Sequence, residues 1–382
     1  MKKFLLCLVA LAFLAFDASA PASAACGGGA SNCFVVAAGG NSNSTSTWSA
    51  TSGGATCTCT PAATDAVILD SAAGNLTINA ALSVASLNAT GTGGSGSPYT
   101  GTLTLNSGTT ATFTGDVTLV SGMTFSRGSG TSVFQWTNTS GTAHLTTAGK
   151  TMPNITINGI GGTLQYLDAV TLGTNVTTTL TAGTLDQNGK TVTSGFAMAN
   201  SANAIFTMGA GTWIVDNSGG FYIAGSSANV TASSGTIIFS NFIGASTAAL
   251  ANKSYGTVTI SPNTGTDTSA VSVTCGGGCT IGTFNIAGPR QISFNQTHTF
   301  TITNAFNWTG PLTFSSSSIG TQYTIAAGAV STIGTNANPV MVQDMNTTTS
   351  AVNVIGYSLL NNTFSSGGIT APATGGSGII GG

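Results

Sequence analysis

The chain has 382 residues, of which only 4% are charged, and its formal net charge is −2. Nucleic-acid binding requires Lys and Arg to neutralise phosphates, so this composition excludes a basic nucleic-acid-binding surface. The hydrophobic fraction of 41% argues against disorder of the whole chain, since disordered sequences are poorly hydrophobic. All acidic residues are Asp, and the good helix formers Glu, Lys, Gln and Arg are scarce. An all-β fold is therefore expected.

Residues 1–24 have the three parts of a secretory signal peptide. Lys2 and Lys3 precede an apolar run over residues 4–16, which is shorter than the roughly 20 residues that span a bilayer. Small residues follow, and cleavage is expected after Ala24. A buried N-terminal helix or a lipid anchor at Cys26 is the alternative. The mature protein is expected to be secreted, at a cell surface or on a virion, without an integral membrane span.

Six cysteines remain after residue 24, and an even number in an exported chain favours disulfides. They are Cys26, Cys33, Cys57, Cys59, Cys275 and Cys279. Three glycines between Cys275 and Cys279 can fold back, which makes these two the clearest pair. Cys57 and Cys59 are expected on one face of a strand, so each is predicted to bridge to Cys26 or Cys33. Zinc binding is the alternative, but the spacing is unusual for zinc and both His residues are distant. No metal and no cofactor are expected.

Short segments that alternate apolar residues with Thr recur along the chain, and this period of two is typical of half-buried strands. In chain order they are Leu76–Ile78, Leu103–Leu105, Thr112–Thr114, Val117–Leu119, Met123–Phe125, Ile155–Ile157, Val258–Ile260, Phe300–Ile302 and Leu312–Phe314. Strands this short cannot each build a core, but stacked coils bury one continuous apolar column. The pattern predicts a parallel β-helix, or β-solenoid. An array of β-sandwiches is the alternative.

The same patterns predict how the chain is organised. Residues 25–60 hold four cysteines and few strands, and are expected to form a cap over the first sheet edge. Residues 61–270 are predicted to form the main solenoid and residues 271–365 a second β region. Residues 366–382 are Gly-rich and are expected to form a loose tail. Solenoid edges favour stacking between copies, so a homo-oligomer remains open.

Several segments resemble a family of repetitive phage and bacterial proteins. They are Cys33–Gly40, Thr47–Gly54, Pro61, Asp65–Asp70, Lys150–Gly159, Leu180–Gly189 and Phe206–Trp213. The resemblance covers most of residues 33–330 and implies a β-helix that serves as a phage virion or tail-associated structural protein, or as a bacterial surface protein. The chain departs from the family at Val35, where Trp is usual, and lacks the usual Gly-Gly-Asn-x-Gly-Trp ending. The signal peptide favours a bacterial surface protein or an exported product of a phage-borne gene.

Catalytic candidates are few in this chain. Hydrolases and lyases on β-helices use carboxylates on neighbouring coils, and Asp168 and Asp186 lie about one coil apart in sequence. Most of the other Asp residues are isolated, and for all of them, Asp168 and Asp186 included, capping of turns through their own backbone is the alternative. Trp136, Trp213, Tyr222 and Trp308 are candidates for stacking on sugars, with burial in the core as the alternative.

These observations predict a non-enzymatic structural or adhesive solenoid. Its expected partners are cell-surface glycans or other virion or surface proteins, and not nucleic acid. A polysaccharide hydrolase or lyase on the same fold is the alternative. A third hypothesis, an autotransporter passenger, is disfavoured by the Gly-rich sequence at the end of the chain.

Overall fold

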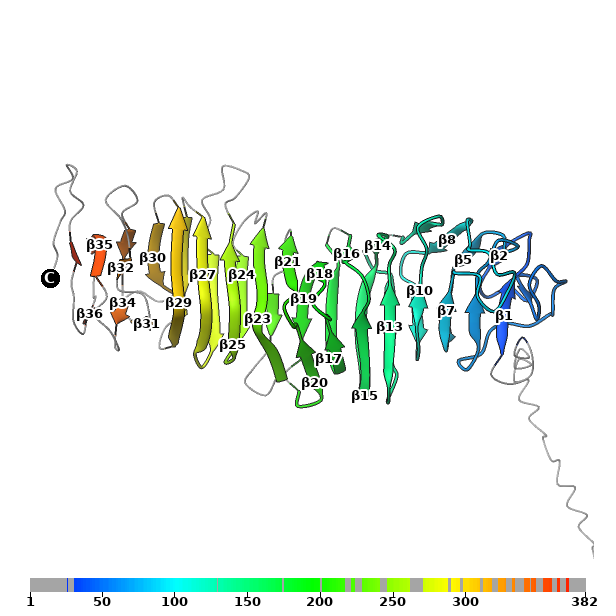
Figure 1. Ribbon diagram of the computed structural model, residues 1–382, viewed down its shortest axis with the longest axis horizontal. Helices are drawn as coiled ribbons and strands as arrows, with labels where there is room; N and C mark the ends of the chain where they lie inside the picture. The colour runs from blue at the N-terminus through cyan, green and yellow to red at the C-terminus, as the bar shows by residue number, and fades with distance from the viewer. Residues whose placement is uncertain are drawn as a thin grey trace, which may run out of the picture.

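The computed structural model describes Cys26 and residues 31–370 with gaps. The gaps are residues 129, 174, 200, 217–220, 224–228, 241–245, 262–270, 288–289, 296–297, 310–311, 318–321, 328–331, 334–339, 344, 348–352, 359–362 and 365–368. The predicted signal peptide and residues 371–382 therefore lie outside the described residues. The described elements are all β-strands, and they stack into one elongated solenoid (Figure 1). The predicted parallel β-helix is confirmed.

Three columns of parallel strands run along the solenoid, because each coil contributes up to three strands and each strand pairs with its counterparts on the neighbouring coils. The first column contains β1 (Asn32–Val35), β4 (Ala66–Ile68), β7 (Ser86–Asn88), β10 (Val117–Thr118), β13 (Thr142–Thr146), the second parts of β15 (Asn154–Tyr166) and β17 (Thr177–Asp186), β20 (Ala204–Thr207), the first parts of β23 (Asn229–Ser240), β25 (Ser254–Ile260), β27 (Cys279–Ala287) and β29 (Thr299–Thr309), then β31 (Tyr323–Ala327), β34 (Met345–Thr347) and β36 (Thr363–Phe364).

The second column is built in pieces. It contains β2 (Gly40–Asn41), β5 (Leu76–Ile78), β8 (Thr102–Leu105) and β11 (Thr124–Ser126), then β14 (Thr151–Met152), β16 (Val170–Leu172), β18 (Thr191–Thr193), β21 (Thr212–Asp216) and the second parts of β23, β25, β27 and β29. Near the C-terminal end, β32 (Thr332–Ile333), the start of β35 (Asn353–Ser358) and β37 (Ile369–Thr370) pair with one another. Among the described strands, no pairing joins β11 to β14.

The third column is continuous. It contains β6 (Leu82–Val84), β9 (Thr110–Phe113), β12 (Val133–Trp136), the first parts of β15 and β17, β19 (Gly195–Met198), β22 (Phe221–Ile223), β24 (Ser246–Ala251), β26 (Val271–Gly276), β28 (Arg290–Phe294), β30 (Leu312–Ser316), β33 (Val340–Val342) and the end of β35.

The predicted domain boundaries can be compared with these columns. β24 pairs with β26, so the third column continues from one side of residue 270 to the other. β1 pairs in parallel with β4, which makes part of the predicted cap the first strand of the solenoid. Ile369 pairs with Val354, so the sheet extends into the segment that was expected to be a loose tail.

The first sheet edge is covered at the N-terminal end. The antiparallel strand β3 (Trp48–Ser49) lies along β1, with Phe34 opposite Ser49 and Val35 opposite Trp48. The Trp48 ring is fully buried, and its Nε1–H donates to the Ser42 carbonyl oxygen at 2.9 Å. Because an uncovered strand edge is a template for further pairing, β3 protects the outer edge of β1.

Aromatic side chains from all three columns meet inside the solenoid. The Phe196 ring on β19 lies with its centroid 4.8 Å from those of Phe206 and Trp213 and 4.9 Å from that of Phe221. All four rings are fully buried. Aromatic contacts of this kind add about 0.5–1.5 kcal/mol per pair beyond burial of their area, so they tie the three columns to one core.

Glycines allow the chain to turn sharply between columns. Gly159 and Gly162 lie at the corner within β15, against the preceding coil, and a Cβ atom at either position would overlap the backbone carbonyl oxygen of Asn138. Backbone cannot move aside as a flexible side chain can, so only glycine fits these positions without a shift of the neighbouring coil.

We expect Gly162→Ala to lower the free energy of unfolding by about 1–3 kcal/mol, as other overpacked sites do. Gly122→Ala is the matched control, because a Cβ there meets its nearest neighbours only at 4.0 Å. Chemical denaturation of both variants measures the difference. Equal stabilities would show that the corner is not restrictive.

Two buried tyrosines allow a second comparison. The Tyr99 hydroxyl lies 3.0 Å from the Gly74 and 2.9 Å from the Thr102 carbonyl oxygen, and burial raises its pKa to about 12, with the Leu76 amide acting in the opposite direction. Burial also raises the pKa of Tyr166, an effect that the nearby Thr178 hydroxyl reduces. The Tyr166 hydroxyl nevertheless makes no hydrogen bond of acceptable geometry to the described residues.

Tyr99→Phe should therefore lower the free energy of unfolding by about 1 kcal/mol, because it removes a satisfied buried hydrogen bond. Tyr166→Phe should leave stability unchanged or increase it, since a buried hydroxyl without a partner is costly. Thermal denaturation at neutral pH tests this order of the two variants, and the reverse order would contradict it.

Candidate functional site

Aspartates link neighbouring coils along the N-terminal half of the solenoid. Asp65 is fully buried and accepts hydrogen bonds from the Ser31 amide and hydroxyl, both at 3.2 Å, and from the Ala62 amide at 2.8 Å. Ser31 precedes β1 and Asp65 precedes β4, so this carboxylate joins the first two strands of the first column. Asp168 and Asp186, the two catalytic candidates from the sequence, join neighbouring coils in the same way.

Asp168 and Asp186 each bind a different group on the preceding coil. Asp168, in the turn after β15, accepts from the Thr147 amide at 2.9 Å and the Ala148 amide at 2.6 Å. Asp186, at the end of β17, accepts from the Gln165 side-chain amide at 2.7 Å. The two carboxylates are thus engaged in separate contacts, and the structure gives no contact between them. These contacts join neighbouring coils, and Asp186 also accepts from the Asn188 amide at 2.8 Å, which is a turn-capping contact with its own backbone segment.

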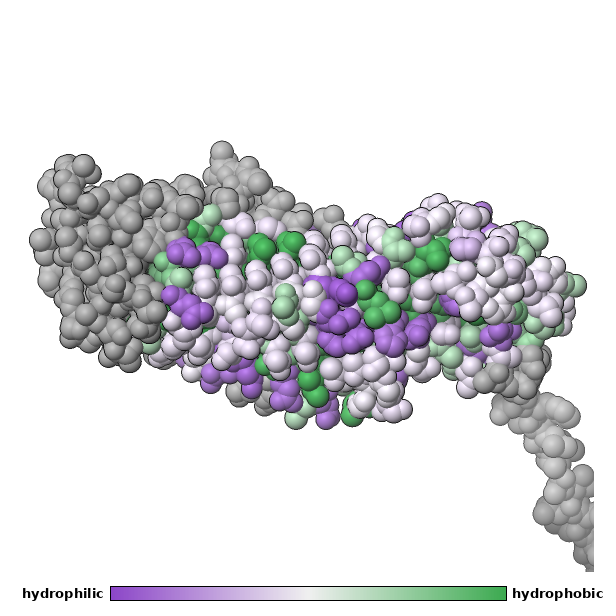
Figure 2. Space-filling view, in the orientation of Figure 1, coloured by the Kyte–Doolittle hydropathy of each residue, from purple (hydrophilic) through white to green (hydrophobic). Residues whose placement is uncertain are grey.

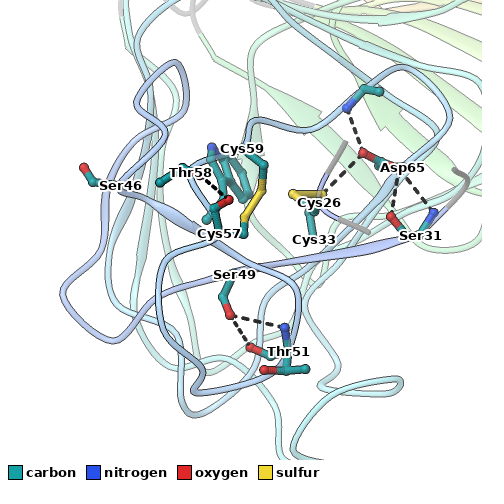
Figure 3. The surroundings of a disulfide bond; sticks show 12 residues. Cys26, Ser31, Cys33, Ser46, Ser49, Thr51, Cys57, Thr58, Cys59 and Asp65 are labelled. Carbon is teal, nitrogen blue, oxygen red and sulfur yellow. Dashed lines mark hydrogen bonds between the residues drawn. A yellow bond between two sulfur atoms is a disulfide. The ribbon is translucent and has the colours of Figure 1, made fainter. Parts of the chain in front are cut away.

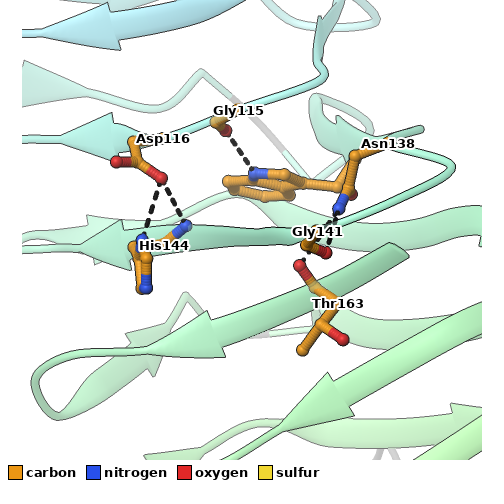
Figure 4. Close-up of polar contacts among 7 residues, drawn as sticks. Gly115, Asp116, Asn138, Gly141, His144 and Thr163 are labelled. Carbon is orange, nitrogen blue, oxygen red and sulfur yellow. Dashed lines mark hydrogen bonds and ion pairs between the residues drawn. The ribbon is translucent and has the colours of Figure 1, made fainter. Parts of the chain in front are cut away.

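Asp116 and His144 form an exposed pair on the outer surface (Figure 4). Asp116 Oδ1 lies 3.0 Å from His144 Nδ1 and accepts from the His144 amide at 2.8 Å. The two side chains are 55% and 36% exposed. Even a charged pair in so exposed a position would contribute only about 0–1 kcal/mol, so these two residues act mainly as a link between coils.

Two of the sugar-stacking candidates are core residues, which corrects the prediction. Trp136 and Trp213 are fully buried, and their Nε1–H groups donate to the carbonyl oxygens of Gly115 at 3.1 Å and Ser194 at 3.0 Å. The first of these bonds is visible in Figure 4. Both tryptophans lie on alternating strands whose inner face is filled by aromatic packing. The side chain of Trp308 lies outside the described residues.

Tyr222 is the stacking candidate that the structure leaves exposed, at 54%. It lies on β22 between Ala197 on β19 and Ala249 on β24. The small side chains on both neighbouring strands leave the phenol ring free on the outer surface, where it can contact a ligand from the side.

A hollow of about 360 Å³ opens at the N-terminal end. Its lining includes Ser31, Asn32, Phe34, Thr51, Ser52 and Gly94. Half of the lining residues carry a hydroxyl or side-chain amide, and Phe34, Ala50 and two glycines form the rest. This mixture of polar and apolar groups suits an uncharged hydroxylated ligand better than an ion. Three separate segments of the chain form this hollow, residues 31–34, 50–52 and 93–94, so no local sequence motif could predict it.

Asp70 lies beside this hollow and fixes its walls. Its carboxylate accepts from the Ser52 hydroxyl at 2.5 Å, the Ser95 amide at 2.8 Å and the Ala72 amide at 3.0 Å. Burial alone would raise the pKa of Asp70, but these hydrogen bonds outweigh burial and lower the pKa below its ordinary value. A side chain at Gly94 would overlap this carboxylate, so the close approach of the loop requires glycine.

The cysteine pairing agrees with the sequence prediction in one case and differs in the other. Cys275 and Cys279 form a disulfide as predicted, with positive φ at Gly277 and Gly278. The predicted bridges from Cys57 and Cys59 to Cys26 or Cys33 are wrong.

The two N-terminal disulfides join Cys57 to Cys59 and Cys26 to Cys33 (Figure 3). Thr58 has a φ of 55°, which breaks the expected strand and turns its two neighbours toward each other, with Cα atoms 5.2 Å apart. The sequence prediction failed because it assumed extended backbone at Thr58.

The two N-terminal disulfides lie close together. The sulfur atoms of Cys26, Cys57 and Cys59 lie within 4.8 Å of one another, and a second group of the same size joins Cys26, Cys33 and Asp65. Zinc binds cysteine as the thiolate, so these sulfurs, paired as they are, do not offer that ligand. The arrangement is a disulfide cluster.

Only 4% of the residues are charged, and the face drawn in Figure 2 is mostly intermediate in hydropathy, with scattered hydrophilic and hydrophobic patches. Polar side chains form rows along the outer surface: the Asn307 side-chain amide donates to Asn285 Oδ1 at 2.9 Å, and the Asn285 amide donates to the Thr259 hydroxyl at 3.2 Å. Such rows hydrate the surface without charge. The described residues include no helix that could span a membrane.

Comparison with known proteins found no matching family model, no matching curated protein and no matching solved structure. The functional argument therefore depends on the geometry of the fold and of the N-terminal end.

Asp70→Asn should lower the free energy of unfolding by about 1–3 kcal/mol at neutral pH, because an amide cannot accept all of these hydrogen bonds. The pKa of Asp70 is lowered on folding, so its stabilisation is complete above the unfolded value of about 3.9 and is lost as the pH falls below it. Melting curves of the wild type and the variant should differ equally at pH 7 and pH 5, and should converge at lower pH.

Asp116→Asn is the control, because its exposed pair should contribute less than about 1 kcal/mol. Equal losses for the two variants at pH 7 would contradict the assigned role of Asp70.

Proposed function

We propose that this protein is a non-enzymatic structural and adhesive β-solenoid, exported to a cell surface or carried on a virion. The observation that supports this role most directly is the use of the described carboxylates. Asp65, Asp168 and Asp186 each bind groups on a neighbouring coil. The acidic side chains thus join coils to one another along the solenoid.

Export is supported by the composition and by the covalent links. The three disulfides of the described chain are stable in oxidising compartments, and the N-terminal sequence has the pattern of a signal peptide. An extended, nearly uncharged surface suits contact with glycans or with other surface proteins. The resemblance to phage and bacterial surface β-helices favours the same role.

Adhesion would use the exposed features already described. The hollow beside Asp70 offers hydroxyl and amide groups for hydrogen bonds to a sugar, and Tyr222 offers an aromatic ring for stacking. Contacts of this kind require neither a titrating group nor a metal ion. Host or neighbouring-cell surface glycans are therefore the proposed ligands.

The experiment compares binding with turnover for the purified mature chain. Incubation with extracted cell-surface polysaccharides should show retention on the polysaccharide without release of reducing ends or unsaturated uronates. Tyr222→Ala and Ser52→Ala should weaken retention several-fold, while the buried-core control Phe206→Leu should leave it unchanged if the fold is retained by circular dichroism.

Release of reducing sugars that Asp168→Asn or Asp186→Asn abolishes would overturn the proposal in favour of a polysaccharide hydrolase or lyase. Absence of retention on every polysaccharide tested would overturn the adhesive part of the role.

A further inference from the structure

The Cys26 sulfur of one N-terminal disulfide lies close to both sulfurs of the other. Cys26 is bonded to Cys33, yet its sulfur also lies within 4.8 Å of those of Cys57 and Cys59. A thiolate exchanges with a disulfide by direct attack on sulfur, so a short movement would bring the second pair into reach of Cys26.

The four cysteines differ in their access to solvent. Cys57 is only partly buried, whereas Cys26, Cys33 and Cys59 are buried. An external thiol therefore reaches the Cys57 sulfur most readily. The leaving thiolate, Cys59, then lies within 4.8 Å of the Cys26 sulfur.

Asp65 can accept a hydrogen bond from Cys33 when Cys33 is reduced to a thiol. Cys33 Sγ lies 3.5 Å from Asp65 Oδ2, a donor–acceptor contact that becomes a hydrogen bond only when Cys33 carries a thiol hydrogen. In the disulfide there is no such hydrogen. Reduction at Cys33 thus gains a hydrogen bond that the oxidised cap does not have.

We propose that the N-terminal cap is a thiol–disulfide exchange site, in which an external thiol modifies Cys57 and the released reducing equivalent passes through Cys59 and Cys26 to Cys33. In the first step the external thiolate bonds to Cys57 Sγ, the Cys57–Cys59 bond breaks, and Cys59 leaves as the thiolate. In the second step Cys59 bonds to Cys26 Sγ, the Cys26–Cys33 bond breaks, and the Cys33 thiolate takes the proton that the external thiol lost.

The products are a mixed disulfide at Cys57, a Cys26–Cys59 disulfide and a Cys33 thiol that donates to Asp65. No further oxidant or reductant is needed, because each bond formed replaces one broken. The substrate class is a small thiol or an exposed cysteine of another surface protein, to which the cap would become covalently linked. This site is independent of the adhesive role proposed above.

The variant Cys57→Ser isolates the second step, because it leaves Cys59 as the unpaired cysteine. The full mature chain is held at pH 8, quenched and unfolded in acid, alkylated with N-ethylmaleimide, digested and mapped by mass spectrometry. We expect the alkyl label mainly on Cys33, together with peptides joined through Cys26 and Cys59. Label that stays on Cys59, with the Cys26–Cys33 link intact, would overturn the proposal.

Cys275→Ser is the matched control, because it also creates one unpaired cysteine, Cys279. Cys279 does not belong to either of the two groups of close side chains around Cys26. In this variant the label should stay on Cys279. Circular dichroism shows whether each variant keeps its β structure.

The wild-type chain tests the first step without any substitution. With reduced glutathione as the probe, the adduct should form on Cys57, and labelled Cys33 should increase in proportion to it. An adduct on Cys59, or one on Cys57 with the label on Cys59, would contradict the proposed route.

Discussion

Parallel pairing between successive coils is the constraint on which the whole structure depends. Each coil must present its strands in register with the coils on both sides, so its inner positions must be apolar and its corners must be narrow. The aromatic cluster around Phe196 and the glycine corner at Gly162 satisfy these two requirements. A substitution that places a polar residue at an inner position, or a larger residue at a narrow corner, therefore disturbs more than one coil.

The scarcity of charge follows from the same constraint. A stacked column places equivalent positions close together. A charged residue repeated on successive coils would therefore lie beside a residue of the same charge and be repelled by it. The chain instead uses hydroxyl and amide rows, such as that from Thr259 through Asn285 to Asn307. It reserves its aspartates for individual links such as Asp65 to Ser31.

The sequence predicted the class of fold because strand alternation is a local property. Leu76–Ile78 is buried, half-buried and buried in turn, as its pattern indicates. The pairing of Cys57 with Cys59 was missed because it depends on one left-handed residue, Thr58, which nothing in the local pattern reveals. The hollow beside Asp70 was missed because distant segments form it, and the burial of Trp136 and Trp213 could only be weighed as an alternative.

The interruption of the second column between β11 and β14 has a mechanical consequence. Elsewhere along most of the rod, tension along the axis is shared by three hydrogen-bonded ladders, whereas at this level the described pairings are those of β10 with β13 and β12 with β15. A filament anchored at one end and pulled at the other would yield first where fewer ladders resist. Stretching at this level would thus separate an N-terminal block, with its disulfides and hollow intact, and a second such level lies near the C-terminal end, where no described pairing joins β29 to β32.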